Sequence, residues 1–111
     1  MRSDRERLLD IIEAAEKIAV RVQRGRETFD ADEDVRFAVV HLLEIVGEAA
    51  GGVSESFRSR TPEVPWSLII AMRNRIAHGY FDVDHDIVWR AAAEDLPPVA
   101  ARLRGAATEV I

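Results

Sequence analysis

Residues 35–53 read VRFAVVHLLEIVGEAAGGV, and this stretch decides the fold class. Its apolar side chains recur every three or four residues, which is the spacing of one face of an α-helix. The members of this apolar face are Val35, Ala38, Val39, Leu42, Leu43, Val46, Ala49, Ala50 and Val53. Asp30 and Glu33 match the pattern of a capping box ahead of it, so we predict a long helix from about residue 31 to about residue 57.

Glycines interrupt this helix at Gly47 and at the pair Gly51-Gly52. An interior glycine costs a helix about 1 kcal/mol relative to alanine. Two interpretations remain open. The small residues let another helix approach closely, including one from a second protomer, or the helix frays at Gly51.

Two further helices are predicted on either side of this one. The first begins at a capping box of Ser3 and Glu6 and ends at Arg24-Gly25-Arg26. The other follows a rigid connector, residues 61–66, in which two prolines disfavour helix at the residues before them. It is predicted from about residue 66 to about residue 78, with Trp66 as an apolar anchor and Gly79 as the carboxy-terminal cap.

The carboxy-terminal third predicts a fourth helix capped by Asp82 or Asp84, with His85 on the surface of its first turn. The sequence Leu96-Pro97-Pro98 is expected to break that helix, and a short amphipathic piece then runs to Val110. No alternating strand pattern is present. We therefore predict one all-α domain over residues 1–111, an antiparallel four-helix bundle with a short fifth C-terminal helix.

Composition narrows the classes of function. The formal net charge is −5, so any binding to nucleic acid must come from a local basic site. The chain has no cysteine, which excludes disulfides and thiolate metal sites. No apolar run is long enough for a membrane span, and none follows the amino terminus as in a signal peptide. We expect a cytoplasmic protein.

The polar groups with chemical potential gather in residues 72–80, Met-Arg-Asn-Arg-Ile-Ala-His-Gly-Tyr, at the end of the third helix. Arg73 and Arg75 carry planar cationic groups suited to phosphate. His78 exchanges a proton near neutral pH, and Tyr80 follows a glycine where the chain leaves the helix. Asn74 adds a carboxamide. These residue types together indicate a site that acts on a phosphate.

The long helix also carries His41, Glu44 and Glu48, spaced about one turn apart. They lack a recognised metal-binding pattern, so a metal site is a minor alternative. A second hypothesis is that one of the two glutamates orients an arginine of the 72–80 segment.

The spacing of Arg73, four residues, His78, one residue, Tyr80 resembles the signature of the HEPN superfamily, in its HepT-like branch. The resemblance covers nearly the whole chain, without a departure at the motif positions. It extends over residues 43–50 (LEIVGEAA), 62–66 (PEVPW), 87–89 (IVW) and 94–97 (EDLP).

This resemblance implies a homodimeric, metal-independent endoribonuclease that needs no cofactor, the toxin of a type II/VII-like toxin–antitoxin system. Its substrate would be RNA, either tRNA or mRNA. Its partner would be a minimal nucleotidyltransferase antitoxin that transfers AMP to Tyr80. Arg73 and His78 would be the catalytic residues, with Asn74 and Arg75 supporting them at the phosphate.

Helix geometry makes the dimer part of this expectation. At about 100° per residue, Arg73 and His78 point about 140° apart, whereas Asn74 and His78 lie nearly on one stripe. One protomer therefore does not present Arg73 and His78 side by side unless the last turn unwinds. Two copies about a two-fold axis could share one cleft.

Three other interpretations stay open. Arg73 and Arg75 could only complement the helix dipole while His78 and Tyr80 cap and pack, with Tyr80 against Trp89 or Phe81. The chain could be a non-catalytic helical module that binds a nucleotidyltransferase. It could also be a nucleotide-binding subunit in which the two arginines hold the phosphate of AMP or ATP.

Overall fold

The computed structural model describes residues 2–77 and 84–110, and these residues form helices and connecting turns without a strand. The all-α prediction is confirmed. None of the described helices is both long enough and apolar enough to cross a membrane. The elements in chain order are α1 (Asp4–Val22), α2 (Arg26–Ala31), α3 (Glu33–Gly52), α4 (Glu55–Arg60), α5 (Trp66–Ala77), α6 (His85–Arg90), the π-helical turn η2 (Ala91–Asp95) and α7 (Leu96–Val110).

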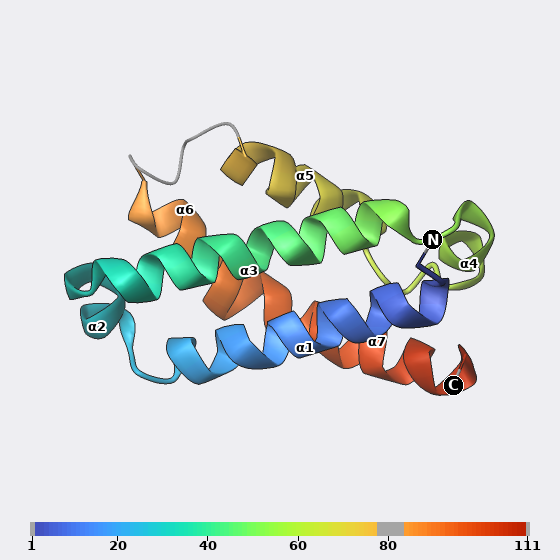
Figure 1. The fold of residues 1–111 in the computed structure, drawn as a ribbon, viewed down its shortest axis with the longest axis horizontal. Helices are drawn as coiled ribbons and strands as arrows, with labels where there is room; N and C mark the ends of the chain where they lie inside the picture. Colours follow the sequence, from blue (N-terminus) through green and yellow to red (C-terminus); the bar gives the residue numbers. More distant parts are fainter. Residues whose placement is uncertain (1, 78–83, 111) are drawn as a thin grey trace.

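The helices form an elongated bundle with extents of 41 × 26 × 24 Å. Figure 1 shows α1 and α3 antiparallel at its centre, with α5 packed along α3 and α7 along α1. The chain direction alternates through α1, α3, α5 and α7 (Figure 1). As a result, the carboxy-terminal end of α5 lies over the middle of α3, and the start of α6 lies over its amino-terminal half (Figure 1).

The core lies mainly between α1 and α3. Six of the larger aliphatic side chains of these two helices have no exposed surface: Leu8, Ile11, Ile18, Val39, Leu43 and Val46. Burying one aliphatic side chain of this size stabilises the fold by about 1.5–3 kcal/mol. The apolar stripes predicted for these two helices therefore account for their pairing.

Three of the predicted local features are confirmed. Ser3 Oγ accepts a hydrogen bond from the Glu6 amide at 3.1 Å, and Glu6 Oε1 accepts one from the Ser3 amide at 3.0 Å, which is a complete capping box. Asp84 caps α6 by accepting from the Asp86 and Ile87 amides. Trp66 is 6% exposed and donates from Nε1 to Thr61 Oγ1, so it is an anchor.

The single helix predicted from about 31 to about 57 is wrong at both ends. Asp32, in an extended conformation, caps α3 by accepting from the Asp34 and Val35 amides, so Asp30 is not the cap. Asp30 belongs to the separate short helix α2 and pairs with Arg26. Four acidic residues lie within five positions here, and pattern matching could not distinguish which of them caps the helix.

At the other end α3 stops at Gly52, after which Val53 is extended and Ser54 starts α4. Ser54 accepts from the Phe57 amide and donates from Oγ to Asp4 Oδ2 at 2.6 Å. Hydrogen bonds from Ser54 hold the pKa of Asp4 below its ordinary value. This contact between α1 and α4 joins residues fifty positions apart and fixes the break after the glycine pair.

The predicted break at Leu96-Pro97-Pro98 is also wrong, because α6, η2 and α7 follow one another without a loop. The Leu96 amide donates to Ala91 O, five residues back, which makes the turn wider than an α-helical one. Pro97 and Pro98 then fall in the first turn of α7, where a missing N–H removes little. The final helix is therefore fifteen residues long.

Candidate active site

The position of Arg73 is set by Gly47. A Cβ built at Gly47 would overlap Cβ and Cγ of Arg73 and would lie 3.3 Å from its Cα. The glycine therefore lets α5 approach α3 at this level more closely than any other residue allows. Of the two interpretations, close approach of another helix is therefore the one that holds at Gly47. The approaching helix, α5, belongs to the same chain. At Gly52 the space is filled by the guanidinium of Arg7, and nothing lies within 4 Å of a Cβ at Gly51.

The side chain of Arg73 is half-buried between these helices, and its Nε is buried without a hydrogen-bond partner in the described part of the chain. Leaving a buried donor unsatisfied costs about 1–3 kcal/mol. The ion pairs among the described residues do not include one from Arg73 to Glu44 or Glu48. Among the described residues neither carboxylate therefore pairs with Arg73. For Arg75, whose side chain is not described, the hypothesis that a glutamate orients an arginine stays a prediction.

The other residues of the predicted motif are described to different extents. Asn74 is exposed on α5. Arg75 lies in α5 by its backbone, while its side chain is outside what is described. His78 and Tyr80 lie outside the described residues, as do the predicted cap Gly79 and the alternative cap Asp82. Their predicted roles stay predictions.

Glu44 lies one turn before Gly47 on α3. Because α3 and α5 are antiparallel, that turn of α3 is level with the last turn of α5 (Figure 1). Glu44 is half-buried, whereas His41 and Glu48 are exposed. The described residues contain no group of three or more side chains placed to hold a metal ion.

A polar cluster that the sequence did not reveal joins α2 to the start of α6. Arg26 pairs with Asp30 of its own helix and with Asp86, sixty residues away in the chain. The hydrogen bond from Arg26 lowers the pKa of Asp86. His85 Nδ1 lies 3.7 Å from Asp30 Oδ1. The cluster holds the first turn of α6 beside the start of α3.

Trp89 belongs to the same region. Its ring centroid is 5.3 Å from that of Phe29, and the guanidinium of Arg26 lies 5.9 Å above the indole ring. These contacts account for two neighbours of Trp89. The alternative in which Tyr80 packs on Trp89 concerns a residue outside the described part of the chain.

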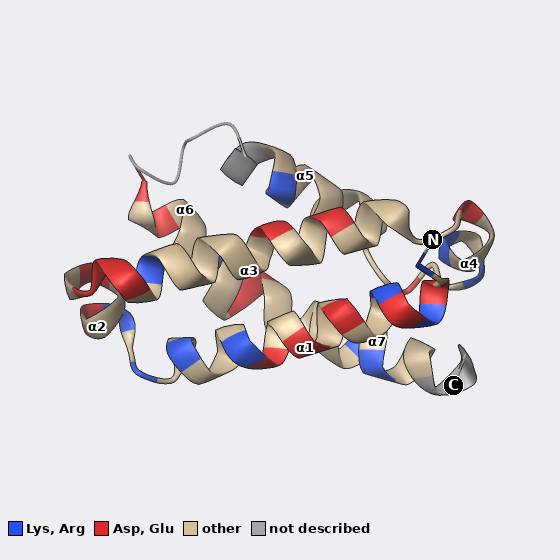
Figure 2. Ribbon diagram, viewed as in Figure 1, with Lys and Arg blue, Asp and Glu red and all other residues tan. Residues whose placement is uncertain are grey.

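The view of Figure 2 shows no continuous basic face: acidic and basic positions are interspersed along α1, and α3 is mainly acidic with one basic position. The acidic positions in the middle of α3 lie beside the basic position on α5 (Figure 2). With a net charge of −5, attraction of an anion would depend on this local site.

The chain is similar to proteins that are named as ribonucleases. A family model described as "Ribonuclease HepT-like" matches residues 11–105. A Thermococcus cleftensis protein named "Probable ribonuclease HepT" is 36% identical, over 91% of this chain and 93% of its own length. A Methanocaldococcus jannaschii protein named "Putative RNase MJ1380" is 34% identical, over 83% of this chain and 85% of its own length. No solved structure matches.

The contact between Gly47 and Arg73 predicts opposite effects for two alanine substitutions on α3. Gly47→Ala forces α5 away and should destabilise the protein by about 1–3 kcal/mol, as overpacking does. Gly51→Ala, the matched control, has open space for its methyl group and should stabilise the helix by about 0.5–1 kcal/mol. Urea unfolding followed by circular dichroism measures both. Equal stabilisation by the two substitutions would contradict the close approach.

Proposed function

The chain belongs to the ribonuclease HepT-like family, and from this premise we propose that it is a metal-independent endoribonuclease, the toxin of a type II/VII-like toxin–antitoxin pair. One observation of the structure carries the proposal best. Arg73 is pressed against Gly47, and the described residues give its guanidinium no hydrogen bond or ion pair. A fixed cation that none of the described residues pairs with is suited to bind an anion from outside.

The proposed reaction uses the RNA's own 2′-hydroxyl as nucleophile. Its oxygen attacks the adjacent phosphorus, the 5′-oxygen of the next nucleotide leaves, and a 2′,3′-cyclic phosphate remains. His78 takes the proton from the 2′-hydroxyl or returns one to the leaving oxygen. No metal ion or cofactor takes part in these steps.

Arg73 stabilises negative charge on the reacting phosphate in this scheme. The phosphorane carries more negative charge than the starting phosphodiester, and a cation already in position stabilises it without reorganisation. Arg73 has its stem packed on α3, so its position is set before substrate arrives. Asn74 orients His78 or a phosphate oxygen, and Arg75 contributes a second cation at the phosphate.

A homodimer completes the proposed site. Arg73 and His78 diverge by about 140° on an ideal helix, so two α5 helices facing one cleft would combine the arginine of one protomer with the histidine of the other. A large apolar side chain of α5 is available for such contacts, because Leu68 is 70% exposed.

Loss of either proposed catalytic group is expected to abolish toxicity and RNA cleavage. His78→Ala and Arg73→Ala should each lower the cleavage rate by about 10²–10⁴-fold. Cleavage should continue in excess chelator and leave cyclic phosphate ends, measured by gel assay and mass spectrometry of the products.

The matched controls are His41→Ala and Arg21→Ala, which remove an exposed histidine and an arginine away from α5. Both should cleave RNA like the wild type. Activity that disappears with chelator and returns with a divalent ion, or that depends on His41, would overturn the mechanism.

The dimer is expected to persist at micromolar concentration. Light scattering should give twice the mass of one chain, and mixing Arg73→Ala with His78→Ala should restore part of the activity, because one mixed site then holds both groups. A monomer with full nuclease activity would remove this part of the proposal.

Control of the toxin is proposed to act on Tyr80. A nucleotidyltransferase partner would join the tyrosine oxygen to the α-phosphorus of ATP, with pyrophosphate leaving. The added phosphodiester would pair with Arg73 and Arg75 and occupy the place of the RNA phosphate.

Tyr80→Phe is therefore expected to keep most of the nuclease activity while escaping a co-expressed nucleotidyltransferase. Mass spectrometry of the co-expressed wild type should find AMP on the peptide that carries Tyr80. An unmodified peptide from a fully neutralised complex would show that the partner inhibits by binding alone.

A further inference from the structure

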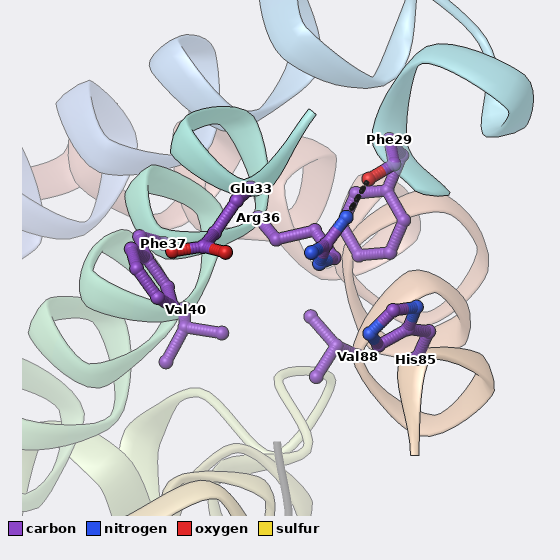
Figure 3. A pocket seen from close by; sticks show the side chains of 7 residues that line it. All are labelled: Phe29, Glu33, Arg36, Phe37, Val40, His85 and Val88. Atoms are coloured by element: carbon purple, nitrogen blue, oxygen red, sulfur yellow. Dashed lines mark hydrogen bonds between the residues drawn. The ribbon is translucent and has the colours of Figure 1, made fainter. Parts of the chain in front are cut away.

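A small cavity lies between the start of α3, α2 and the start of α6. Its volume is about 180 Å³, and Figure 3 shows its lining: Phe29, Glu33, Arg36, Phe37, Val40, His85 and Val88. Pockets for whole small molecules usually measure about 300–1,000 Å³. This one suits a single flat ring system. The polar cluster of Arg26, Asp30 and Asp86 holds its two sides together.

Arg36 is the fixed hydrogen-bond donor of this cavity. Its Nη1 donates to Phe29 O at 3.0 Å and to Asp30 O at 2.6 Å, at the carboxy-terminal end of α2. Both hydrogens of Nη1 are thereby used. Nε and Nη2 make no hydrogen bond with the described residues, and Figure 3 shows the guanidinium directed into the cavity.

Glu33 and Phe37, on the first two turns of α3, line the cavity beside Arg36. The Glu33 carboxylate makes no hydrogen bond or ion pair with the described residues, although it and Arg36 line one cavity. Phe37 keeps 51% of its surface exposed at the edge. A cation, an anion and an aromatic face are thus available together, which is the set of contacts by which proteins hold an unstacked base.

The cavity lies along α3 from the proposed active site. Gly47 is level with Arg73, so Ala77 is about 6 Å further along α5, toward the start of α3, and Val40 about 10 Å along α3 in the same direction. The stretch from Val40 to Glu33 therefore begins about one turn beyond the last turn of α5. A single RNA strand with its phosphate at Arg73 has a nearby base within reach of it.

We propose that this cavity is a base-binding subsite of the ribonuclease, selective for guanine near the cleaved bond. The inference rests on the proposed function for its RNA substrate. Arg36 donates to O6 and N7 of guanine, the pairing most often found for arginine and a base. Glu33 accepts from N1–H and the N2 amino group on the neighbouring edge, and Phe37 stacks on the ring.

The other bases fit this arrangement less well. Adenine presents an amino group at the position where Arg36 also donates, and its N1 has no hydrogen for Glu33. Cytosine likewise has no ring N–H. Uracil offers one N–H beside its O4 but lacks the adjacent N7, so it should bind second most tightly of the four bases.

Binding is tested on the full-length wild type with the four 5′-mononucleotides, which share a phosphate and lack the bond that the enzyme would cut. In titrations followed by ¹H–¹⁵N NMR, GMP should bind roughly 10-fold more tightly than AMP and shift amide signals of residues 33–40 and 85–88. Glu33→Gln should remove the preference for GMP, and Phe37→Ala should weaken GMP binding roughly 5- to 100-fold. Arg36 is left unchanged because its Nη1 also closes the end of α2.

Glu16→Gln and Val20→Ala are the matched controls, an exposed acid and an exposed apolar residue of α1, and both should bind like the wild type. Equal affinities for the four nucleotides, or shifts confined to other residues, would overturn the proposal. Cleavage of a random RNA pool separates it from the proposed function. Wild type should cut beside guanine, and Glu33→Gln should cut with that bias lost.

Cleavage with the same bias in Glu33→Gln would overturn the subsite and leave the ribonuclease standing. GMP binding in the cavity without cleavage of any RNA would support the subsite and contradict the ribonuclease.

Discussion

The close approach of α5 to α3 at Gly47 sets the geometry of the rest of the molecule. A hydrogen atom in place of a methyl group lets the stem of Arg73 lie on the α3 backbone, at the level where a Cβ would overlap it. This fixes the register of the two antiparallel helices. The last turn of α5 is then level with Glu44, and the start of α6 lies over the first turns of α3 (Figure 1). Packing and chemistry meet at one residue, because the contact that aligns the helices also holds the candidate catalytic arginine.

The elements around this contact keep its surroundings in place. The π-helical turn lets α6 continue into α7 despite Pro97 and Pro98, so one continuous rod spans the bundle. At the far end Arg26 links α2 to α6 through Asp86. Exposed ion pairs contribute little to stability, so this pair acts mainly by fixing geometry. The cavity around Arg36 is a consequence of that geometry.

Sequence patterns sufficed for three features whose determinants are local. The capping box at Ser3, the cap at Asp84 and the anchor at Trp66 depend on residues within five positions of one another, and all three are confirmed. Two other features depend on contacts between residues distant in the chain. The separation of α4 depends partly on the contact of Ser54 with Asp4, and the role of Gly47 depends on a helix twenty-six residues away. The cap of α3 was mistaken because several acids within one turn fit the same rule.

For the site, the sequence supplied the residue types and the family, while the structure adds the surroundings of Arg73. His78 and Tyr80 lie outside the described residues, so the roles expected for them from the resemblance stay predictions. The cluster of Arg26, Asp30 and Asp86 could not have been predicted, because it joins two helices sixty residues apart and none of its members has an unusual neighbour in the sequence.

The central claim is that Gly47 acts on catalysis through Arg73, by allowing the arginine to be held against α3. A double-mutant cycle on kcat/KM for RNA cleavage, with Gly47→Ala, Arg73→Ala and the double variant, tests it most directly. The account predicts that Gly47→Ala lowers kcat/KM in the wild type and has no further effect once Arg73 is alanine. Fully additive losses in the double variant, with both single variants folded, would contradict it.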